Sequence, residues 1–396
     1  FAALSTDNAP GQEVRQSNED IRNLVIGAPL PGRPVDFSHG DVDAFPPPPE
    51  AMERFEEAVR IGGRQAYTEY RGSADIRAEL AGKLEAFTGA PVSKDAGIIV
   101  TPGTQGALFL AVAATVAADD KVAIVQPDYF ANRKLVRFFG GEVVPIAMDY
   151  LGSTEGAGLD LSQLEAAFTA GAKVFVFSNP NNPTGAVYSP REIERIVALA
   201  KRYGATIVAD QLYSRLQYAG ESYTHIRASG LPDDQCLTIM GPSKTESLSG
   251  YRLGVAFGAP AIVDRMEKLQ AIVSLRAAGY NQAVLRSWFD EPAGWMERRM
   301  TEHRQIRDEL LATFSAAGFP TRRPQAGSYV FPTLPRLTVA PPDFVRLLRH
   351  QAEVIVTPGT EFGPHEQSIR LNFSQDRTAA LDAAHRIVEM VERYKV

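Results

Sequence analysis

Residues 243–254 contain a single lysine, Lys244, among small and hydroxylated residues. Apolar runs at 236–240 and 253–257 flank this segment, which predicts two buried strands with Lys244 on a connection at the edge of a core. A free ammonium is costly there, whereas desolvation lowers a lysine pKa and frees the amine to attack a carbonyl. Lys244 is therefore a candidate Schiff-base nucleophile, although a lone loop lysine is more often a solvated surface residue.

A second connection predicts an anion site. Gly103, Thr104 and Gln105 follow a short predicted strand and open a predicted helix. Their backbone N–H groups would lie at the positive end of the helix dipole and could bind a phosphate. By itself this signal is weak, because glycine turns before helices are common. Arg252, eight residues beyond the lysine, could hold an anion near the same place.

Polar and aromatic side chains follow three further predicted strands. Tyr129 comes after one strand, Asn182 lies on a proline-rich loop after the next, and Asp210 ends a third, with Tyr213 three residues on. Taken singly they could be a packed ring, a plain turn and a structural ion pair, since a buried carboxylate needs a cation or hydrogen bonds. Ligands of open parallel sheets bind beyond the carboxyl ends of the strands, so we expect these side chains to lie together.

One ligand explains the whole set. Its phosphate would meet residues 103–105 and Arg252, its flat ring would stack on Tyr129, and its protonated ring nitrogen would pair with Asp210. A molecule with a phosphate and an aromatic cation is predicted by these four groups.

The remaining residues complete that ligand. Asn182 and Tyr213 would donate hydrogen bonds to a phenolic oxygen, and an aldehyde would bond to the amine of Lys244. The molecule with all of these groups is pyridoxal 5′-phosphate, whose chemistry requires a lysine next to a proton-holding carboxylate.

The elements that must position these residues alternate between strand and helix from about residue 97 to 210. The strands read as continuous apolar runs, as expected when both faces of a parallel sheet are covered. One helix has a full start signal, with Ser189 as N-cap, Pro190 in the first position and Glu192 closing a capping box, and Gly204 stops it.

The two ends of the chain do not show this regular alternation of strand and helix patterns. Length alone predicts two subdomains. Residues 50–60 and 75–87 have helical spacing, and a smaller α+β subdomain, joined by the N-terminal arm, is predicted after about residue 290. Its expected elements are a helix at 296–317, short strands near 328–331, 354–356 and 369–372, and a helix at 379–394.

Composition excludes several classes of protein. The 396 residues carry a net charge of -6, so the composition does not indicate the positive surface that binds nucleic acid. One cysteine rules out a disulfide within the chain, and the histidines form no close pair, so no metal site is predicted. The sequence has neither a membrane-length apolar run nor a secretory core at its start, and we expect a cytoplasmic protein.

At these residues the chain resembles the class I/II aminotransferases of the aspartate aminotransferase superfamily, the pyridoxal phosphate enzymes of fold type I. The loop at 179–185 matches N-P-x-N-P-T-G, and residues 210–213 match D-x-x-Y. Residues 243–254 match S-K-x-x-x-x-x-G-x-R-x-G, and 358–363 match P-G-x-x-F-G. Arg370 then matches the family's carboxylate-binding arginine. All of these motifs occur in order, and the resemblance runs nearly end to end.

The resemblance implies a fold and an assembly. It implies a large cofactor domain, residues 45–288, with a mainly parallel seven-stranded sheet flanked by helices. Residues 1–44 and 289–396 would form the smaller α+β domain with its N-terminal arm. Tyr67 matches the tyrosine that reaches the phosphate of the neighbouring subunit, which implies a homodimer with shared active sites.

It also implies roles for single residues. Lys244 would carry the cofactor and then move the proton, and Asp210 would keep the ring nitrogen protonated, with Tyr213 as the third catalytic residue. Arg370 would bind the substrate α-carboxylate, which Asn182 would touch. Gly27 would approach the same carboxylate through its backbone.

Two departures from the family pattern concern the cofactor. Gly241 stands where the family often has a phosphate-binding serine, so Ser243 or Thr104 must serve instead. Tyr129 replaces the tryptophan of some members, an exchange of one ring for another. Neither departure removes a group that the chemistry requires.

The leading hypothesis is transamination from an L-amino acid to a 2-oxo acid by a ping-pong route, with a neutral or broad donor and pyruvate or 2-oxoglutarate as acceptor. The alternative is a lyase, decarboxylase or oxidase acting on an amino acid in the same site, because fold does not fix reaction. Release of a stoichiometric oxo acid would favour transamination. A regulator that uses the fold to bind an effector is disfavoured, because there is no basic patch and no room for a DNA-binding domain ahead of residue 50.

Overall fold

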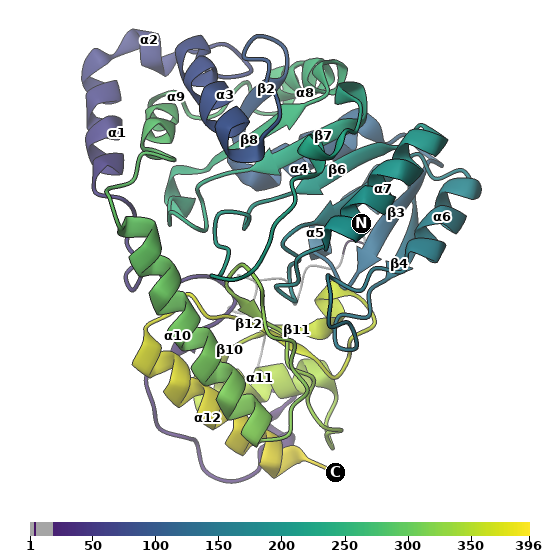
Figure 1. Ribbon diagram of the computed structural model, residues 1–396. Helices are drawn as coiled ribbons and strands as arrows, with labels where there is room; N and C mark the ends of the chain where they lie inside the picture. The colour runs from purple at the N-terminus through teal and green to yellow at the C-terminus, as the bar shows by residue number, and fades with distance from the viewer. Residues whose placement is uncertain (1–3, 5–18) are drawn as a thin grey trace.

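The computed structural model describes residue 4 and residues 19–396. Residues 1–3 and 5–18, the first part of the predicted N-terminal arm, lie outside the described residues. Figure 1 shows a larger part built around a central sheet and a smaller part below it, which helix α10 (Trp295–Ala316) enters from above.

The central sheet has seven strands, as predicted. All are parallel except β8, which is antiparallel to both of its neighbours. The buried, continuous apolar strands explain why the sheet can be covered on both faces. In spatial order the strands are β2 (Ile98–Pro102), β8 (Leu253–Gly258), β7 (Cys236–Met240), β6 (Thr206–Asp210), β5 (Val174–Ser178), β3 (Lys121–Gln126) and β4 (Glu142–Ala147).

Helices cover both faces of this sheet, because alternate strand residues point to opposite sides. Ile99 packs in the core under α4 (Gly103–Thr115), α5 (Phe130–Phe138) and α8 (Pro260–Val273). The other face packs against α6 (Leu161–Thr169), α7 (Pro190–Tyr203) and α3 (Ala74–Thr88). Short elements complete this part, namely α1 (Glu50–Ile61), α2 (Gly63–Ala66), α9 (Gly279–Gln282) and 3-10 helices at Ile226–Ser229, Asp233–Gln235, Ser249–Tyr251 and Ala283–Ser287.

The start of α7 forms as its sequence predicts. Ser189 accepts the N–H of Glu192 at 3.3 Å, and the Glu192 carboxylate accepts the N–H of Ser189 at 2.7 Å. Gly204 ends the helix in a left-handed conformation, with φ of 64°. The same carboxylate also accepts the backbone N–H groups of residues 157–159, so the capping box anchors the preceding loop as well.

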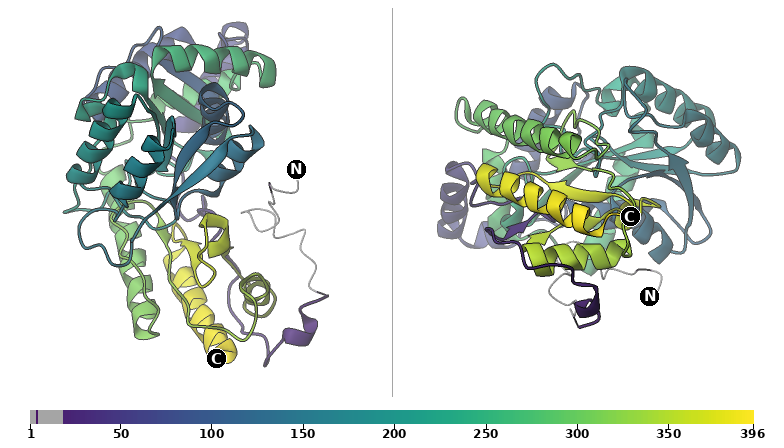
Figure 2. Two further views of the ribbon diagram at one scale, coloured as in Figure 1. Left: turned by 90° about the vertical axis from the view of Figure 1, so that its right-hand side faces the viewer. Right: turned by 90° about the horizontal axis from the view of Figure 1, so that it is seen from below.

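The smaller part has its own core and two small sheets. Strands β11 (Thr357–Pro358), β12 (Ile369–Asn372) and β9 (Tyr329–Val330) are antiparallel, whereas β1 (Val35–Asp36) pairs parallel with β10 (Val354–Ile355). Figure 2 shows α10, α12 (Arg377–Tyr394) and α11 (Pro341–Ala352) side by side across its base. The β1–β10 pair joins the N-terminal segment to this part. Two 3-10 helices, Arg22–Leu24 and Gly359–Phe362, complete it.

No helix among the described residues is both long and apolar enough to cross a bilayer. No group of three or more His, Cys, Asp or Glu side chains in the same residues is placed to hold a metal ion.

Candidate active site

A pocket of about 220 Å³ lies where the carboxyl ends of β3, β5, β6 and β7 face strands β9 and β12. It brings together ten of the residues singled out in the sequence: Thr104, Gln105, Tyr129, Asn182, Asp210, Tyr213, Ser243, Lys244, Arg252 and Arg370. The expectation that side chains following successive parallel strands converge on one site is met by this geometry.

One end of the pocket is suited to an anion. Helix α4 starts at Gly103, and its N-cap residue, Pro102, provides no capping side chain for the N–H groups of the first turn. Arg252 crosses this turn so closely that a Cβ on Gly103 would lie 2.6 Å from Arg252 Nη2. Gly103, with φ of 76°, is thus required both by conformation and by space. A helix N-terminus beside a guanidinium is a ready phosphate site.

The glycine at position 241 has a steric reason. A Cβ on Gly241 would lie 2.8 Å from Cγ2 of Thr104, and one on Gly254 would lie 2.3 Å from the Thr104 nitrogen. Thr104 therefore occupies the space that a serine at 241 would need. Thr104 and Ser243 both line the pocket, so their hydroxyl groups can still donate hydrogen bonds to a phosphate.

Asp210 ends β6 at the base of the pocket. Its Oδ1 accepts the N–H of Leu212 at 3.1 Å, and among the described residues no cationic side chain forms an ion pair with it. Burial raises the pKa of this carboxyl to about 6. The structural ion pair considered from the sequence is therefore absent here, and the carboxylate is suited to a cation from outside the chain. Nearby, the hydroxyl of Tyr129 donates to Gln105 Oε1 at 2.9 Å.

Lys244 lies on the connection between β7 and β8. Within the described part of the chain its amine makes no hydrogen bond or ion pair, although it lines the pocket. The connection itself is fixed from behind by Arg299 of α10, which donates to the carbonyl of Thr245 at 2.6 Å and to Ser247 Oγ at 2.8 Å. A free amine on a rigid loop is the arrangement that a covalent lysine needs.

Arg370 closes the opposite end of the pocket. Its guanidinium is buried and donates to Asn182 Oδ1 at 3.1 Å, to the carbonyl of Ser38 at 2.9 Å and to Thr357 Oγ1 at 3.3 Å. Its Nε has no partner among the described atoms. The guanidinium also lies 4.4 Å from the ring centroid of Tyr329. A planar cation held in this way can bind a carboxylate.

Tyr329 and His39 are among the pocket residues that were not singled out in the sequence. The hydroxyl of Tyr329 lies 2.5 Å from that of Tyr213, and no motif marks it; its place on the predicted strand beside Arg370 was the available signal. His39 was passed over because it forms no histidine pair. Its Nε2 lies 3.2 Å from Asp36, and this hydrogen bond raises the pKa of His39 to about 9.

Three of the predicted residues are not among those that line the pocket. Gly103 lies directly beside it, next to the Arg252 guanidinium. Gly27 lies against Arg393 near the end of α12, and its carbonyl accepts from Gln351 at 3.3 Å. In this structure Ser38, from the same N-terminal region, accepts from Arg370 through its carbonyl, and the approach of the Gly27 backbone to the carboxylate stays a prediction. Tyr67 is 82% exposed at the surface, where the Arg276 guanidinium lies 5.4 Å from its ring centroid.

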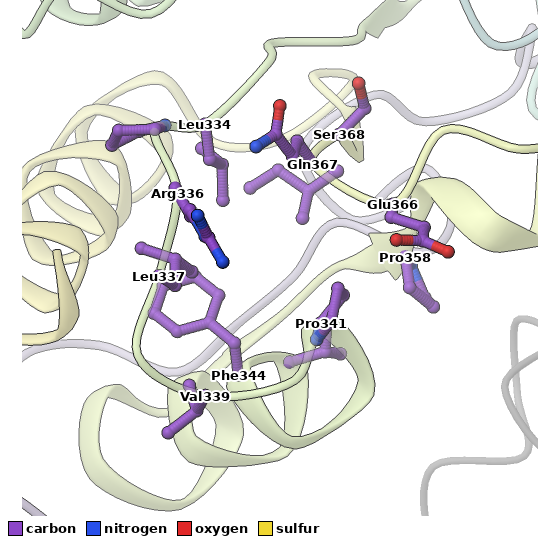
Figure 3. A pocket seen from close by; sticks show the side chains of 13 residues that line it. Leu334, Arg336, Leu337, Val339, Pro341, Phe344, Pro358, Glu366, Gln367 and Ser368 are labelled. Atoms are coloured by element: carbon purple, nitrogen blue, oxygen red, sulfur yellow. The ribbon is translucent and has the colours of Figure 1, made fainter. Parts of the chain in front are cut away.

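A second cavity, of about 250 Å³, opens in the smaller part between α11 and the β11 strand (Figure 3). Apolar side chains such as Leu337, Val339 and Phe344 line it, with Arg336 reaching across. It contains none of the residues predicted to do chemistry, so the first pocket is the candidate active site.

Comparison with known proteins identifies the family. The model for aminotransferase class I and II matches residues 33–387, and the chain belongs to this family, whose members use pyridoxal 5′-phosphate. It is a transaminase: an enzyme that moves an amino group from an amino acid to a 2-oxo acid.

Particular relatives are named for acidic substrates. The solved structure of an aspartate aminotransferase from Rhodobacter sphaeroides has a TM-score of 0.95 and 66% identity, covering 96% of this chain and 98% of its own. The aspartate aminotransferase of Sulfolobus acidocaldarius is 27% identical, covering 91% of this chain and 90% of its own. The aspartate/prephenate aminotransferase of Thermus thermophilus is 28% identical, with 98% and 95% covered.

Proposed function

We propose that the pocket between the two parts binds pyridoxal 5′-phosphate and transaminates L-aspartate with 2-oxoglutarate as acceptor. The observation that carries the cofactor's placement is the half-buried carboxylate of Asp210, which has no cationic partner in the described chain and lines the same cavity as the free amine of Lys244. A protonated pyridine nitrogen is the cation that would match Asp210.

The two ends of the pocket fit the rest of the ligand. The first turn of α4, with Thr104 and Gln105, would bind the phosphate together with Ser243 and Arg252. Gly103 would keep the turn open for the arginine. Tyr129 would cover the ring face, and Asn182 and Tyr213 would donate to the phenolic oxygen. When bound, this cofactor supplies an electron sink that stabilises negative charge at the substrate Cα.

The chain's own residues would then position the substrate and move the proton. Arg370 would bind the α-carboxylate, with Asn182 beside it, and so orient the Cα–H bond. The Lys244 amine would take that proton and hold it beside the substrate Cα. Holding both groups in one small pocket replaces an encounter in solution with a fixed geometry, which is the main contribution of such a site.

Aspartate replaces the neutral donor expected from the sequence because the solved structure at 66% identity is named an aspartate aminotransferase. The pocket supports this choice through its charge, since His39 adds a cation at the end where Arg370 lies. The same enzyme acting as a lyase, decarboxylase or oxidase would consume aspartate without forming glutamate in equal amount.

We also propose a cytoplasmic homodimer with shared active sites, in which residues 45–288 form the large domain and residues 1–44 with 289–396 the small one. Exposed apolar side chains support an interface near Tyr67: Ile272 is 81% exposed and Leu275 55%, next to Arg276, which contacts Tyr67. Light scattering at several concentrations, with Tyr67→Phe tested for cofactor retention, checks both statements.

The central test uses the purified chain loaded with pyridoxal 5′-phosphate. We expect a visible absorption band, borohydride trapping of the cofactor on Lys244, and equal amounts of oxaloacetate and glutamate from aspartate and 2-oxoglutarate. A protein that stays colourless, or trapping on another lysine, would refute the cofactor site. Ammonia or carbon dioxide release without glutamate would refute transamination of aspartate.

A further inference from the structure

The two turns that begin at Tyr213 and at Lys244 have the same layout. The N–H three residues on donates to the carbonyl of Tyr213 at 2.9 Å in one turn and to the carbonyl of Lys244 at 3.3 Å in the other. Both of these first residues line the pocket. The third residue of each turn is charged, Arg215 in one and Glu246 in the other, and neither is among the residues that line the pocket. Each turn therefore combines a pocket residue with a charge outside the pocket lining.

The two charged residues pair with each other. Nη1 of Arg215 donates to Oε1 of Glu246, and the two side chains are only 11% and 1% exposed. The other carboxylate oxygen of Glu246 has no hydrogen-bond partner among the described atoms. Burial raises the pKa of Glu246 to about 7, whereas Arg215 acts to lower it. Most of the carboxylate is therefore ionised at pH 8, where the pair is a buried ion pair.

A second carboxylate also holds the guanidinium. Glu291 accepts Nη1 of Arg215 at 2.7 Å and Nη2 at 2.9 Å, and this two-point contact fixes the plane of the guanidinium. The guanidinium carbon lies 4.1 Å from the ring centroid of Phe289. Residues 289–291 precede α10, which Figure 1 shows running from the larger part into the smaller one. Three segments of the chain thus meet at one guanidinium: the Tyr213 turn, the Lys244 turn and the segment before α10.

Stability alone does not explain a buried ion pair of this kind. Removing two charges from water is costly, and apolar side chains of similar volume are often at least as stable. An ion pair adds a fixed geometry, because a planar guanidinium binds its partners only in defined directions. Here that fixed geometry connects the turn of a pocket phenol with the turn of the pocket amine.

We propose that Arg215 and Glu246 are positioning residues of the transamination site, whose ion pair holds the Tyr213 turn against the Lys244 turn. The pair sets the place of the phenol relative to the amine and touches neither substrate nor cofactor. This inference rests on the proposed function, because that placement matters only where both groups serve one reaction. A displacement of about 1 Å in such a site can lower the rate about 100-fold.

The first measurement uses the cofactor-free protein and does not depend on activity. Hydrogen exchange at pH 8, followed by mass spectrometry, should be about tenfold faster in Glu246→Gln at residues 211–216 as well as at residues 242–248, because each turn has lost its anchor to the other. Exchange in the central sheet should stay unchanged. Glu267→Gln is the matched control: it removes the carboxylate of an ion pair with Arg71 in the larger part and should leave both turns as in the wild type.

The second measurement uses the protein loaded with pyridoxal 5′-phosphate. Glu246→Gln should lower kcat for aspartate about 10- to 100-fold and change KM less than about threefold, because the side chains that bind the substrate remain. The isotope effect on kcat from deuterium at the Cα of aspartate should increase, since a displaced amine removes the proton more slowly. Adding Arg215→Met to Glu246→Gln should lower kcat little further, because both changes break the same contact.

The outcomes separate the two proposals. A wild-type protein that forms no visible band with pyridoxal 5′-phosphate would refute the proposed function. If the band forms and the wild type transaminates, two results in Glu246→Gln would overturn the role of the ion pair while the function stands: faster exchange at residues 242–248 alone, or faster exchange throughout the central sheet. Arg215→Met tests the same coupling from the other turn and serves where Glu246→Gln does not fold. Unchanged exchange at residues 242–248 in that variant would contradict the proposal.

Discussion

The two ends of the active-site pocket are built in different ways. The phosphate end consists of the first turn of α4 and the segment around Arg252, both within the larger part, and depends on glycines that permit close approach. The carboxylate end consists of buried side chains from several segments: Arg370 is held by Ser38, by Asn182 and by Thr357. The first end can therefore exist in the larger part alone, whereas the second exists only when both parts are in place.

This difference predicts that the phosphate end keeps the cofactor bound, whereas the carboxylate end recognises the substrate. Backbone N–H groups at a helix start are preorganised and cannot reorient, which suits a group that stays bound. A guanidinium held by hydrogen bonds across two parts of a molecule responds when either part moves, which suits a substrate that enters and leaves in each half-reaction.

The largest expected effect comes from the residue between the two ends. Lys244→Ala should lose turnover by several orders of magnitude, because both the covalent link and the proton carrier are removed. Both ends remain, so the variant should still bind the cofactor weakly. Steady-state rates and the absorbance of bound cofactor measure the two effects. Near-native turnover in this variant would contradict the assignment of Lys244.

A change at the carboxylate end should affect the substrate alone. Arg370→Ala removes charge-assisted hydrogen bonds to the α-carboxylate and should lower kcat/KM for aspartate about 100- to 1,000-fold. Retention of the cofactor should stay close to that of the wild type, as measured by dialysis and absorbance. Loss of the cofactor together with activity would show that the two ends are not independent.

The reverse pattern is expected at the phosphate end. Arg252→Gln should weaken cofactor binding roughly 10- to 100-fold, because one charged hydrogen-bonding partner of the phosphate is lost. At saturating cofactor its KM for aspartate should be unchanged. Equilibrium binding to the cofactor-free protein gives the first quantity, and a raised KM at saturation would be the contrary result.

The last expected effect concerns the stability of the cofactor-free protein rather than catalysis. The pKa of Asp210 is raised from 3.8 to about 6, so its contribution is fully present below pH 4 and is lost as pH rises through 6. Asp210→Asn should remove this loss, which amounts to roughly 3 kcal/mol at neutral pH. Denaturant unfolding of the wild type and of Asp210→Asn at pH 4 and pH 8 measures this difference. Asp128 and Glu246, whose pKa values are raised, and His225 and His303, whose pKa values are lowered, also contribute to the dependence of stability on pH.

Most of the residues found from the sequence share a physical property: they follow strands of the central sheet, where topology determines the neighbours. Arg252, which precedes β8, and Arg370, which lies within β12, are the exceptions. Asp210, Asn182 and Lys244 are separated along the chain but lie at adjacent strand ends, and their apolar strands identified those ends. The seven strands were recognisable for the same reason. The antiparallel direction of β8 could not be predicted, because a buried strand has the same apolar sequence pattern whether it runs parallel or antiparallel to its neighbours.

The residues that were not found from the sequence depend on contacts between segments far apart in the chain. Gly27 and Ser38 are both in the N-terminal segment, and the pairing of β1 with β10 places Ser38 beside Arg370. Tyr329 is distinguished only by the hydroxyl that it meets across the two parts. Helices α8 and α11 were also absent from the prediction, although each begins at a proline in a favourable first position.

The side chain of Arg299 has a consequence for engineering the enzyme. Besides its bonds to Thr245 and Ser247, it donates to the carbonyl of Pro46 at 2.5 Å, so one guanidinium joins the long helix, the lysine loop and the linker that follows the N-terminal segment. A chimaera that takes the C-terminal half from a relative must therefore inherit all three pieces as a set. Exchanging α10 alone would leave two carbonyls and a hydroxyl without their shared donor, next to the amine on which turnover depends.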